Sequence, residues 1–257
     1  MLDRRDEYEK MAAAEPRLWW YRALHAMVIR KLRQYGAAPS DLIVDAGCGT
    51  GGLMMRLREA GFSNVSGFDL SPYAVEFCQF RNIGIASENV LNCARLYPPA
   101  SAQALICNDI LYFLGPAQQR TALDQFARIL APGGVALINL PALKAFAGTH
   151  DLAVGISHRF SKRGLQDMLE MSSFTLAEAV YWPFLLSPAI YAARCIQRLS
   201  LRLSPPPTRI SSDVRMPPAL INNVLFFIAD TENKLLSRKP FGSSLFLVLR
   251  KLPGQSR

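Results

Sequence analysis

The chain has 257 residues, 50% of them hydrophobic and 19% charged, and this balance predicts a globular protein with a sizeable core. No apolar run reaches the roughly 20 residues that span a bilayer, and the charged N-terminus lacks the apolar segment of a signal peptide. The five cysteines lack the spacing of a zinc site or a disulfide framework, so we expect reduced thiols, no metal and a cytoplasmic protein.

Residues 1–36 are predicted to form an N-terminal helical cap. Apolar side chains recur at helical spacing over residues 18–32, and Gly36 follows as a stop signal. The same helix carries a run of three aromatic residues and an arginine, WWYR, at 19–22. This run has two interpretations. It packs the helix on the domain behind it, or it forms a lid that brings Tyr21 and Arg22 to a bound ligand.

From residue 37 the pattern alternates between strands and helices. Strands are predicted at about 42–46, 64–69, 85–90, 104–107 and 135–140. Helices are predicted between them at about 51–60, 72–82 and 116–130. Further along, we expect a polar loop over 148–159, a helix from 161 to about 171, and strands at 174–182 and 244–251. Strands separated by helices indicate an α/β fold with a parallel, doubly wound sheet.

The predicted α/β domain covers residues 37–182 and regains its last strand, followed by the tail, at 241–257. Residues 183–240 interrupt it as a helical insert that is both basic and apolar. Within the insert, Arg194, Arg198 and Arg202 recur every four residues and so share one helix face. Three roles are open for the insert: a lid over the substrate, a peripheral contact with an anionic membrane, or a homodimer contact.

The net charge of +9 is concentrated towards the C-terminus. Residues 183–257 carry eleven Lys and Arg against three Asp and Glu, whereas residues 1–182 carry eighteen against seventeen. A net +8 in the last part of the chain favours an anionic partner such as lipid head groups or a phosphorylated substrate, although solubility alone would also explain it. The basic residues lack interleaved aromatic residues and an RNA-binding motif, so we expect no nucleic acid partner.

The stretch IVDAGCGTGG, at 43–52, is the strongest signal in the chain. It predicts a strand that ends in Asp45, a glycine-rich turn, and a helix directly after. Glycines at such a turn let the backbone approach a ligand closely. A second carboxylate, Asp69, ends the next strand a little over twenty residues later, about where nucleotide-binding α/β units place the acid that binds ribose.

Ligands of an open parallel sheet bind at the carboxyl ends of its strands. Asp45, Asp69, Asn92 and the pair Asn108-Asp109 are all predicted to lie at such ends. With a nucleoside ligand, Asp69 would accept from the ribose hydroxyls and Asn92 would meet the adenine edge. Asp45 would organise the turn or meet a cationic amino group.

These stretches resemble the motifs of one family. VDAGCGTG at 44–51 and GFDLS at 67–71 resemble the first two motifs of the class I S-adenosylmethionine-dependent methyltransferases, and LAPGG at 130–134 resembles the turn before their fifth strand. The resemblance covers about residues 18–180 and implies a Rossmann-like methyltransferase fold with S-adenosyl-L-methionine as its cofactor. The expected cofactor contacts are Tyr21, Arg22, Asp45, Gly47, Cys48, Gly49, Asp69, Leu70, Asn92 and Asn108.

A dinucleotide-binding turn is the alternative for the same glycines. That fingerprint, GxGxxG, places a pyrophosphate at the N-terminus of a helix. Here Asp45 precedes the glycines, and a carboxylate at that point would repel a pyrophosphate but suits a sulfonium-bearing amino acid. We therefore favour a methyl donor.

Methyl transfer from a sulfonium is an in-line displacement, so the protein must align the acceptor, exclude water and in some cases take a proton. His150 and His158 are the candidate bases because imidazole titrates near neutral pH, and Tyr112 is a candidate for orienting the acceptor. A structural role is the alternative for each of the three.

The sequence thus predicts a methyltransferase that acts on a small-molecule or lipid-linked acceptor, with oxygen as the favoured atom. The chain departs from the resembled family at Asn92, where many relatives carry Asp, and at Tyr112-Phe113, where relatives often carry Glu-His. These departures keep a second hypothesis open, a catalytically weak or inactive methyltransferase-like partner protein in a larger assembly. The predicted location is the cytoplasm, with peripheral contact of residues 184–240 at the inner face of the membrane as an open option.

Overall fold

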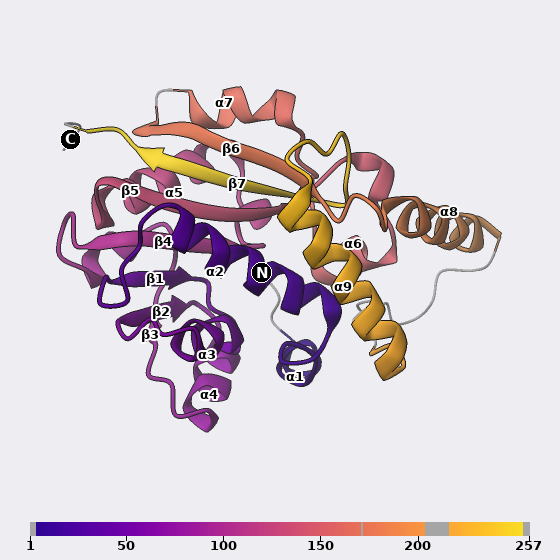
Figure 1. Cartoon of the computed structure of the whole chain (residues 1–257), viewed down its shortest axis with the longest axis horizontal. Coiled ribbons are helices and arrows are strands. Elements are labelled where there is room, and N and C mark those ends of the chain that lie inside the picture. The colour runs from indigo at the N-terminus through magenta and orange to yellow at the C-terminus, as the bar shows by residue number, and fades with distance from the viewer. Residues whose placement is uncertain (1–3, 171, 204–215, 254–257) are drawn as a thin grey trace.

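The computed structural model describes residues 4–170, 172–203 and 216–253, without the side chains of residues 201–203. A seven-stranded sheet crosses the molecule, and helices cover both of its faces (Figure 1). In sheet order, which is β3-β2-β1-β4-β5-β7-β6, the strands are Ala86–Ser87, Val65–Asp69, Ile43–Ala46, Ala102–Asn108, Leu130–Pro141, Ser244–Lys251 and Phe174–Trp182.

The sheet is mixed rather than wholly parallel. Strands β1 to β5 are parallel to their neighbours, but β7 runs antiparallel between β5 and β6. The prediction of a parallel, doubly wound sheet from the first five strands is therefore confirmed, and β7 adds one strand that runs in the opposite direction. The chain order reverses between β1 and β4, so their carboxyl ends form the switch point at which such sheets bind ligands.

The helices follow the predicted alternation closely. They are α1 Arg5–Ala14, α2 Trp19–Gln34, α3 Gly52–Glu59, α4 Pro72–Phe80, α5 Pro116–Ile129, α6 Thr149–Val154, α7 Leu165–Leu169, α8 Ser187–Leu203 and α9 Ala219–Leu235. Short 3-10 turns occupy residues 93–96, 111–113, 144–146 and 162–164. Among the described residues, no helix is both long and apolar enough to cross a membrane.

Three local predictions differ from the structure. The strand predicted at 85–90 is only two residues long, because the chain turns at Glu88 and its carboxylate bonds to Asn89 N and to Arg95. The predicted polar loop over 148–159 contains α6. The helix predicted from 161 to 171 is a 3-10 turn followed by the five residues of α7.

Side chains of successive strand residues enter two separate cores. On β4, Leu105 and Cys107 pack with α5, whereas Ala104 and Ile106 pack with α2 and α3 on the other face. This alternation follows from the two-residue period of a strand, and burial on both faces explains why β4 is apolar throughout.

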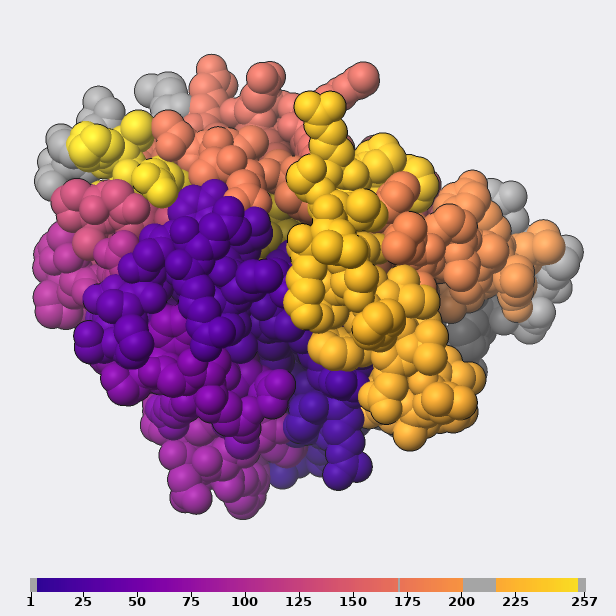
Figure 2. Space-filling view, in the orientation of Figure 1, coloured from indigo at the N-terminus to yellow at the C-terminus, as the bar shows by residue number. Residues whose placement is uncertain are grey.

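The N-terminal cap and the insert lie side by side, although about 200 residues separate them in the chain (Figures 1 and 2). Asn222 of α9 accepts from the backbone N–H of Trp19 at 2.8 Å and donates to the carbonyl of Arg17 at 2.8 Å. Arg30 of α2 pairs with Asp230 of α9 at 3.1 Å. Helix α9 is therefore fastened to both ends of the cap's second helix.

Candidate active site

A cavity of about 480 Å³ lies at the switch point, where β1, β2 and β4 end. Helices α1 and α2 line it from the N-terminal cap, and residues of α6 and α8 line the opposite side. A cavity of this volume is within the range that binds a small molecule or a cofactor.

The glycine turn presents bare backbone to this cavity. Gly47, Gly49 and Gly51 all have positive φ angles, of +74°, +53° and +80°, which side-chain-bearing residues rarely adopt. A Cβ on Gly47 would lie 2.4 Å from the Ile110 side chain. The turn thus requires glycine both for its conformation and for its fit against the segment after β4.

Asp69 joins the turn to the end of β2. One carboxylate oxygen accepts from Gly49 N at 2.9 Å and the other accepts from Ser71 N at 2.9 Å. Each oxygen keeps a further lone pair, and the side chain lines the cavity. Burial raises the pKa of Asp69, and the backbone donors oppose that rise.

Asp45 is buried at the end of β1 and also lines the cavity. Within the described part of the chain, no hydrogen bond reaches its carboxylate. Burial, together with the nearby charges of Glu15 and Asp69, raises the pKa of Asp45 to about 8. A cation placed in the cavity would satisfy this carboxylate and lower its pKa.

Glu15 was not identified from the sequence. It follows α1, and its carboxylate accepts from Gly52 N at 3.1 Å, from Arg81 at 3.0 Å and from the Thr50 hydroxyl. Glu15 therefore caps the N-terminus of α3 with a negative charge. No local pattern could have revealed this contact, because its partners lie 35 to 66 residues away in the chain.

Asp109, after β4, lies on the other side of the cavity. Both carboxylate oxygens accept from the Asn139 amide, at 3.1 and 2.9 Å, and the Asn139 carbonyl accepts from Trp182 Nε1 at 2.9 Å. The φ angle of Asp109 is +57°, a strained value of the kind that clusters at functional sites. Its depth in the protein raises its pKa to about 7, although Asn139 and Arg159 lower it in part.

Most of the residues predicted from the sequence line this cavity. Those that do are Tyr21, Asp45, Gly47, Cys48, Gly49, Asp69, Leu70, Asn108, Tyr112 and His150. Burial raises the pKa of both tyrosines. Asn108 Oδ1 is buried and, among the described residues, has no hydrogen-bond donor. An orphaned acceptor and a glycine cradle in one cavity fit a ligand with polar edges.

Three predicted residues lie outside the cavity lining. Arg22 turns to α9, where it donates to Asn223 at 2.8 Å and lies 4.0 Å over the Phe226 ring. Asn92 stands at the start of the 3-10 turn 93–96, because the chain leaves β3 early; Glu88, Asn89 and Val90 line the cavity instead. His158 packs on Phe160.

His158 is also occupied by polar neighbours, with Gln119 and Ser157 each 3.3 Å from a ring nitrogen. Burial lowers its pKa. The sequence therefore pointed to a histidine outside the cavity and overlooked Asp109 as a site residue, although it had placed Asp109 at a strand end. Among the described residues, no cluster of His, Cys, Asp or Glu is arranged to hold a metal ion.

Residues 43–134 match the model of a family described as a methyltransferase domain. A curated protein of Geobacillus sp. (strain WCH70), named as a methyltransferase, is 27% identical over 139 residues. That alignment covers 52% of this chain and 54% of the relative, so the chain matches about half of the relative's length.

Two solved structures show how far the fold extends. A chain from the complex of the Haloferax volcanii Trm112 methyltransferase activator with a methyltransferase has a TM-score of 0.61 at 18% identity, with 98% of this chain and 99% of that chain covered. The magnesium protoporphyrin IX methyltransferase of Synechocystis PCC 6803, solved with bound S-adenosylmethionine, has a TM-score of 0.52 at 15% identity, with 90% and 79% covered. The comparisons confirm the fold class that the sequence motifs predicted, and residues 43–134 are similar to a methyltransferase domain.

Proposed function

We propose that the chain is a class I S-adenosylmethionine-dependent methyltransferase and that it transfers a methyl group from S-adenosylmethionine to the hydroxyl of a small-molecule or lipid-linked acceptor. The observation that carries the proposal is the shared cavity. Its donor end holds the glycine turn with Asp45 and Asp69, and its acceptor end holds Asp109, Tyr112 and His150.

Residues at the donor end match the separate chemical groups of S-adenosylmethionine. Asp69 has free lone pairs for the ribose hydroxyls, and Asp45 offers a carboxylate without a donor of its own among the described residues to the donor's ammonium group. Asn108 Oδ1 provides a further acceptor. When bound, the donor supplies a methyl group activated by the positive charge of its sulfonium.

The dinucleotide alternative is disfavoured by Glu15. A dinucleotide would set its pyrophosphate at the N-terminus of the helix after the glycine turn. That helix is α3, and the Glu15 carboxylate already accepts from its Gly52 N–H. Two negative groups would then compete for one set of donors.

At the acceptor end, we assign the proton-accepting role to Asp109. With the donor bound, the Asp109 carboxylate would take the proton that the acceptor hydroxyl loses on methylation. A pKa near 7 suits a base that works at neutral pH. Tyr112 orients the acceptor, and His150 remains the second candidate for the proton because it lines the same cavity.

A partner protein without activity is the second candidate function. The departures at Asn92 and Tyr112-Phe113 favour it, and the Haloferax volcanii relative is itself part of a complex with an activator. Formation of S-adenosylhomocysteine from S-adenosylmethionine in the presence of fractionated cell extract supports the enzyme. Binding of the cofactor with no turnover in any fraction supports the partner.

Calorimetry with S-adenosylhomocysteine tests the donor end directly. The loss of hydrogen bonds to a charged group costs about 1.5–3 kcal/mol each, so losing the bonds to two ribose hydroxyls in Asp69→Ala is expected to weaken binding at least about 100-fold. Asp124→Ala, on the exposed side of α5, is the matched control and should bind as the wild type does. If Asp69→Ala binds no more weakly than the control, Asp69 does not hold the ribose.

A further inference from the structure

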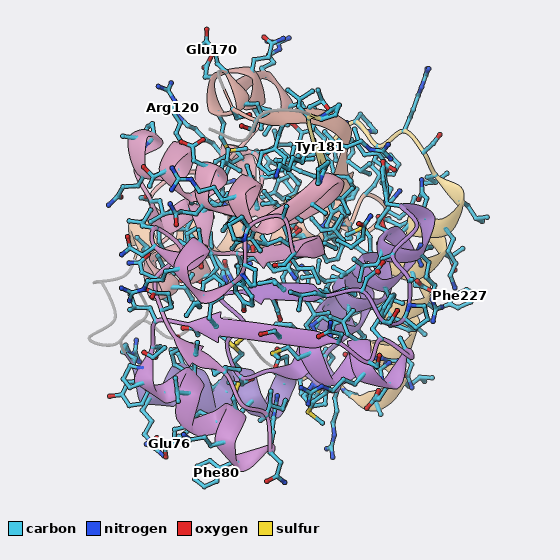
Figure 3. All side chains as sticks on the ribbon, turned by 90° about the vertical axis from the view of Figure 1, so that its left-hand side faces the viewer. Glu76, Phe80, Arg120, Glu170, Tyr181 and Phe227 are labelled. Carbon is cyan, nitrogen blue, oxygen red and sulfur yellow. The ribbon has the colours of Figure 1, made fainter. Side chains whose placement is uncertain are left out.

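Helix α9 exposes a continuous apolar stripe. Leu220, Ile221, Val224 and Phe227 recur at the spacing of one helix face, and their exposed fractions are 77%, 52%, 49% and 69%. Figure 3 shows Phe227 pointing away from the ribbon at the edge of the molecule. We call these four residues the α9 stripe. The helix thus leaves in water the kind of surface that a globular protein normally buries.

The opposite side of α9 packs against the rest of the protein, so the stripe is not the face through which α9 joins the fold. Ala229 is fully buried, Asn222 bonds to the chain between α1 and α2, and the Glu232 carboxylate accepts from the backbone of Phe184 and Leu185 at 2.7 Å each. These contacts hold the orientation of α9 and keep its stripe facing outwards.

The charges around the stripe have one sign on the surface. In the described parts of the insert, 183–203 and 216–240, the two acidic residues are Asp230 and Glu232, with exposed fractions of 9% and 1%. Both are neutralised by cations, Asp230 by Arg30 and Lys234, and Glu232 by Lys239. Lys234 and Arg238 are exposed after the stripe; Lys234 is paired with Asp230, whereas Arg238 has no ion pair among the described residues.

An exposed apolar stripe next to cations distinguishes between two candidate partners for this surface, a second copy of the chain and an anionic bilayer. A second copy of the chain would bring the same cations to the interface, and like charges placed together oppose association. An anionic bilayer offers an apolar layer for the stripe and phosphate groups for the lysine and arginine. We propose that α9 docks on an anionic lipid bilayer, with the α9 stripe in the interface and Lys234 and Arg238 at the head groups.

The position of α9 relative to the cavity gives the docking a use. Asn222 accepts from Trp19 N, and the side chains of Leu18 and Trp19 line the cavity. The docked face therefore lies one helix away from the cavity wall. An acceptor with an apolar tail would reach the cavity from the same surface. The docking would thus specify a lipid-linked acceptor, and this step rests on the proposed function.

Co-sedimentation of the full chain with vesicles tests the docking without any enzyme assay. We expect binding to vesicles that contain phosphatidylglycerol, weak binding to pure phosphatidylcholine, and release from the anionic vesicles as salt rises. Phe227→Asp is expected to lower the partition at least tenfold. The matched control is Phe80→Asp, since Phe80 is 72% exposed at the end of α4 and lies far from Phe227 in Figure 3.

Arg238→Glu isolates the electrostatic part and should weaken binding at low salt while leaving the weak high-salt binding unchanged. Unchanged affinity of each variant for S-adenosylhomocysteine verifies its fold. Equal losses in Phe227→Asp and Phe80→Asp, or no sedimentation of the wild type at low salt, would overturn the proposal. So would a doubling of mass in analytical ultracentrifugation that Phe227→Asp abolishes, because the stripe would then belong to a dimer. Since vesicle binding is read without methyl donor, its failure leaves the proposed function untouched.

Discussion

The donor end and the acceptor end of the cavity hold their carboxylates by different means. At the donor end, Asp69 is held by backbone N–H groups of its own turn and of the glycine turn 20 residues earlier. At the acceptor end, Asp109 is held by the Asn139 side chain, which Trp182 orients from 43 residues further on. Backbone donors follow from local chain geometry, whereas side-chain donors depend on how distant strands are brought together.

This difference affects how each end responds to substitution. A turn that binds through its backbone keeps its donors when side chains change, while a side-chain network is altered by each substitution within it. The comparison predicts that the donor end governs cofactor affinity and the acceptor end governs the rate. Five experiments test this prediction and the assignments behind it.

The largest effect is expected from Asp109→Asn. The amide keeps the size of the side chain but cannot take a proton, so turnover should fall about 10²- to 10⁴-fold. Affinity for S-adenosylhomocysteine should stay within about twofold, because that ligand occupies the donor end. Steady-state rates with the acceptor found in extract, together with calorimetry, check both parts. Equal losses in rate and affinity would show that the two ends do not act separately.

The second effect concerns stability. Arg159 forms a two-point ion pair with Asp151, at 2.6 and 2.7 Å, and donates to the carbonyls of Ala142 and Ser243. Arg159→Met leaves a carboxylate uncompensated in the interior and should cost about 3 kcal/mol in urea unfolding. Arg56→Met, which removes the exposed pair with Glu59, should cost less than about 1 kcal/mol. If the two variants lost similar free energies of unfolding, the buried Arg159–Asp151 pair would not stabilise the fold more than an exposed pair does.

The third effect is a pH dependence at the donor end. Because the pKa of Asp45 is about 8 in the free protein, binding of a cationic group releases a proton below that pH. Affinity for S-adenosylhomocysteine should therefore rise by up to roughly tenfold per unit as pH increases towards 8 and then level off. Asp45→Asn should remove this slope. Calorimetry in buffers of different ionisation enthalpy measures how many protons are released on binding.

The raised pKa of Asp45 also determines whether the free energy of unfolding rises or falls with pH. Between the usual pKa of an aspartate, 3.8, and about 8, the unfolded carboxyl is ionised while the folded one keeps its proton. The free protein therefore loses stability as pH rises through this range, and Asp45→Asn should lose less. Thermal unfolding at several pH values follows the difference between the two proteins.

The smallest effect is expected from His158→Asn. The imidazole lies outside the cavity lining and contacts Gln119, Ser157 and Phe160, so rate and cofactor affinity should both change less than about twofold. His150→Asn is the informative companion, since His150 lines the cavity. A large rate loss in His158→Asn with intact folding would assign the base to His158, one of the two histidines that the sequence named as candidates.

The sequence was most informative where structure is local. Asp45, the glycine turn and Asp69 lie where their spacing predicted, because strand, turn and helix are set by neighbouring residues. Asn92 was placed at a strand end, but β3 closes at Ser87 through the contacts of Glu88, which no local pattern encodes. Glu15 and Asp109 gain their surroundings from segments 30 or more residues away, and the same holds for the antiparallel β7.

The two hydrogen bonds of Asn222 give the molecule a mechanical linkage. From the first turn of α9, this side chain accepts from the backbone N–H of Trp19 and donates to the carbonyl of Arg17, at the short connection between α1 and α2. Helix α1 covers the donor end through Glu15. A restraint on α9 therefore acts on the connection between α1 and α2, and any free energy by which it changes donor affinity equals the free energy by which donor binding changes that restraint.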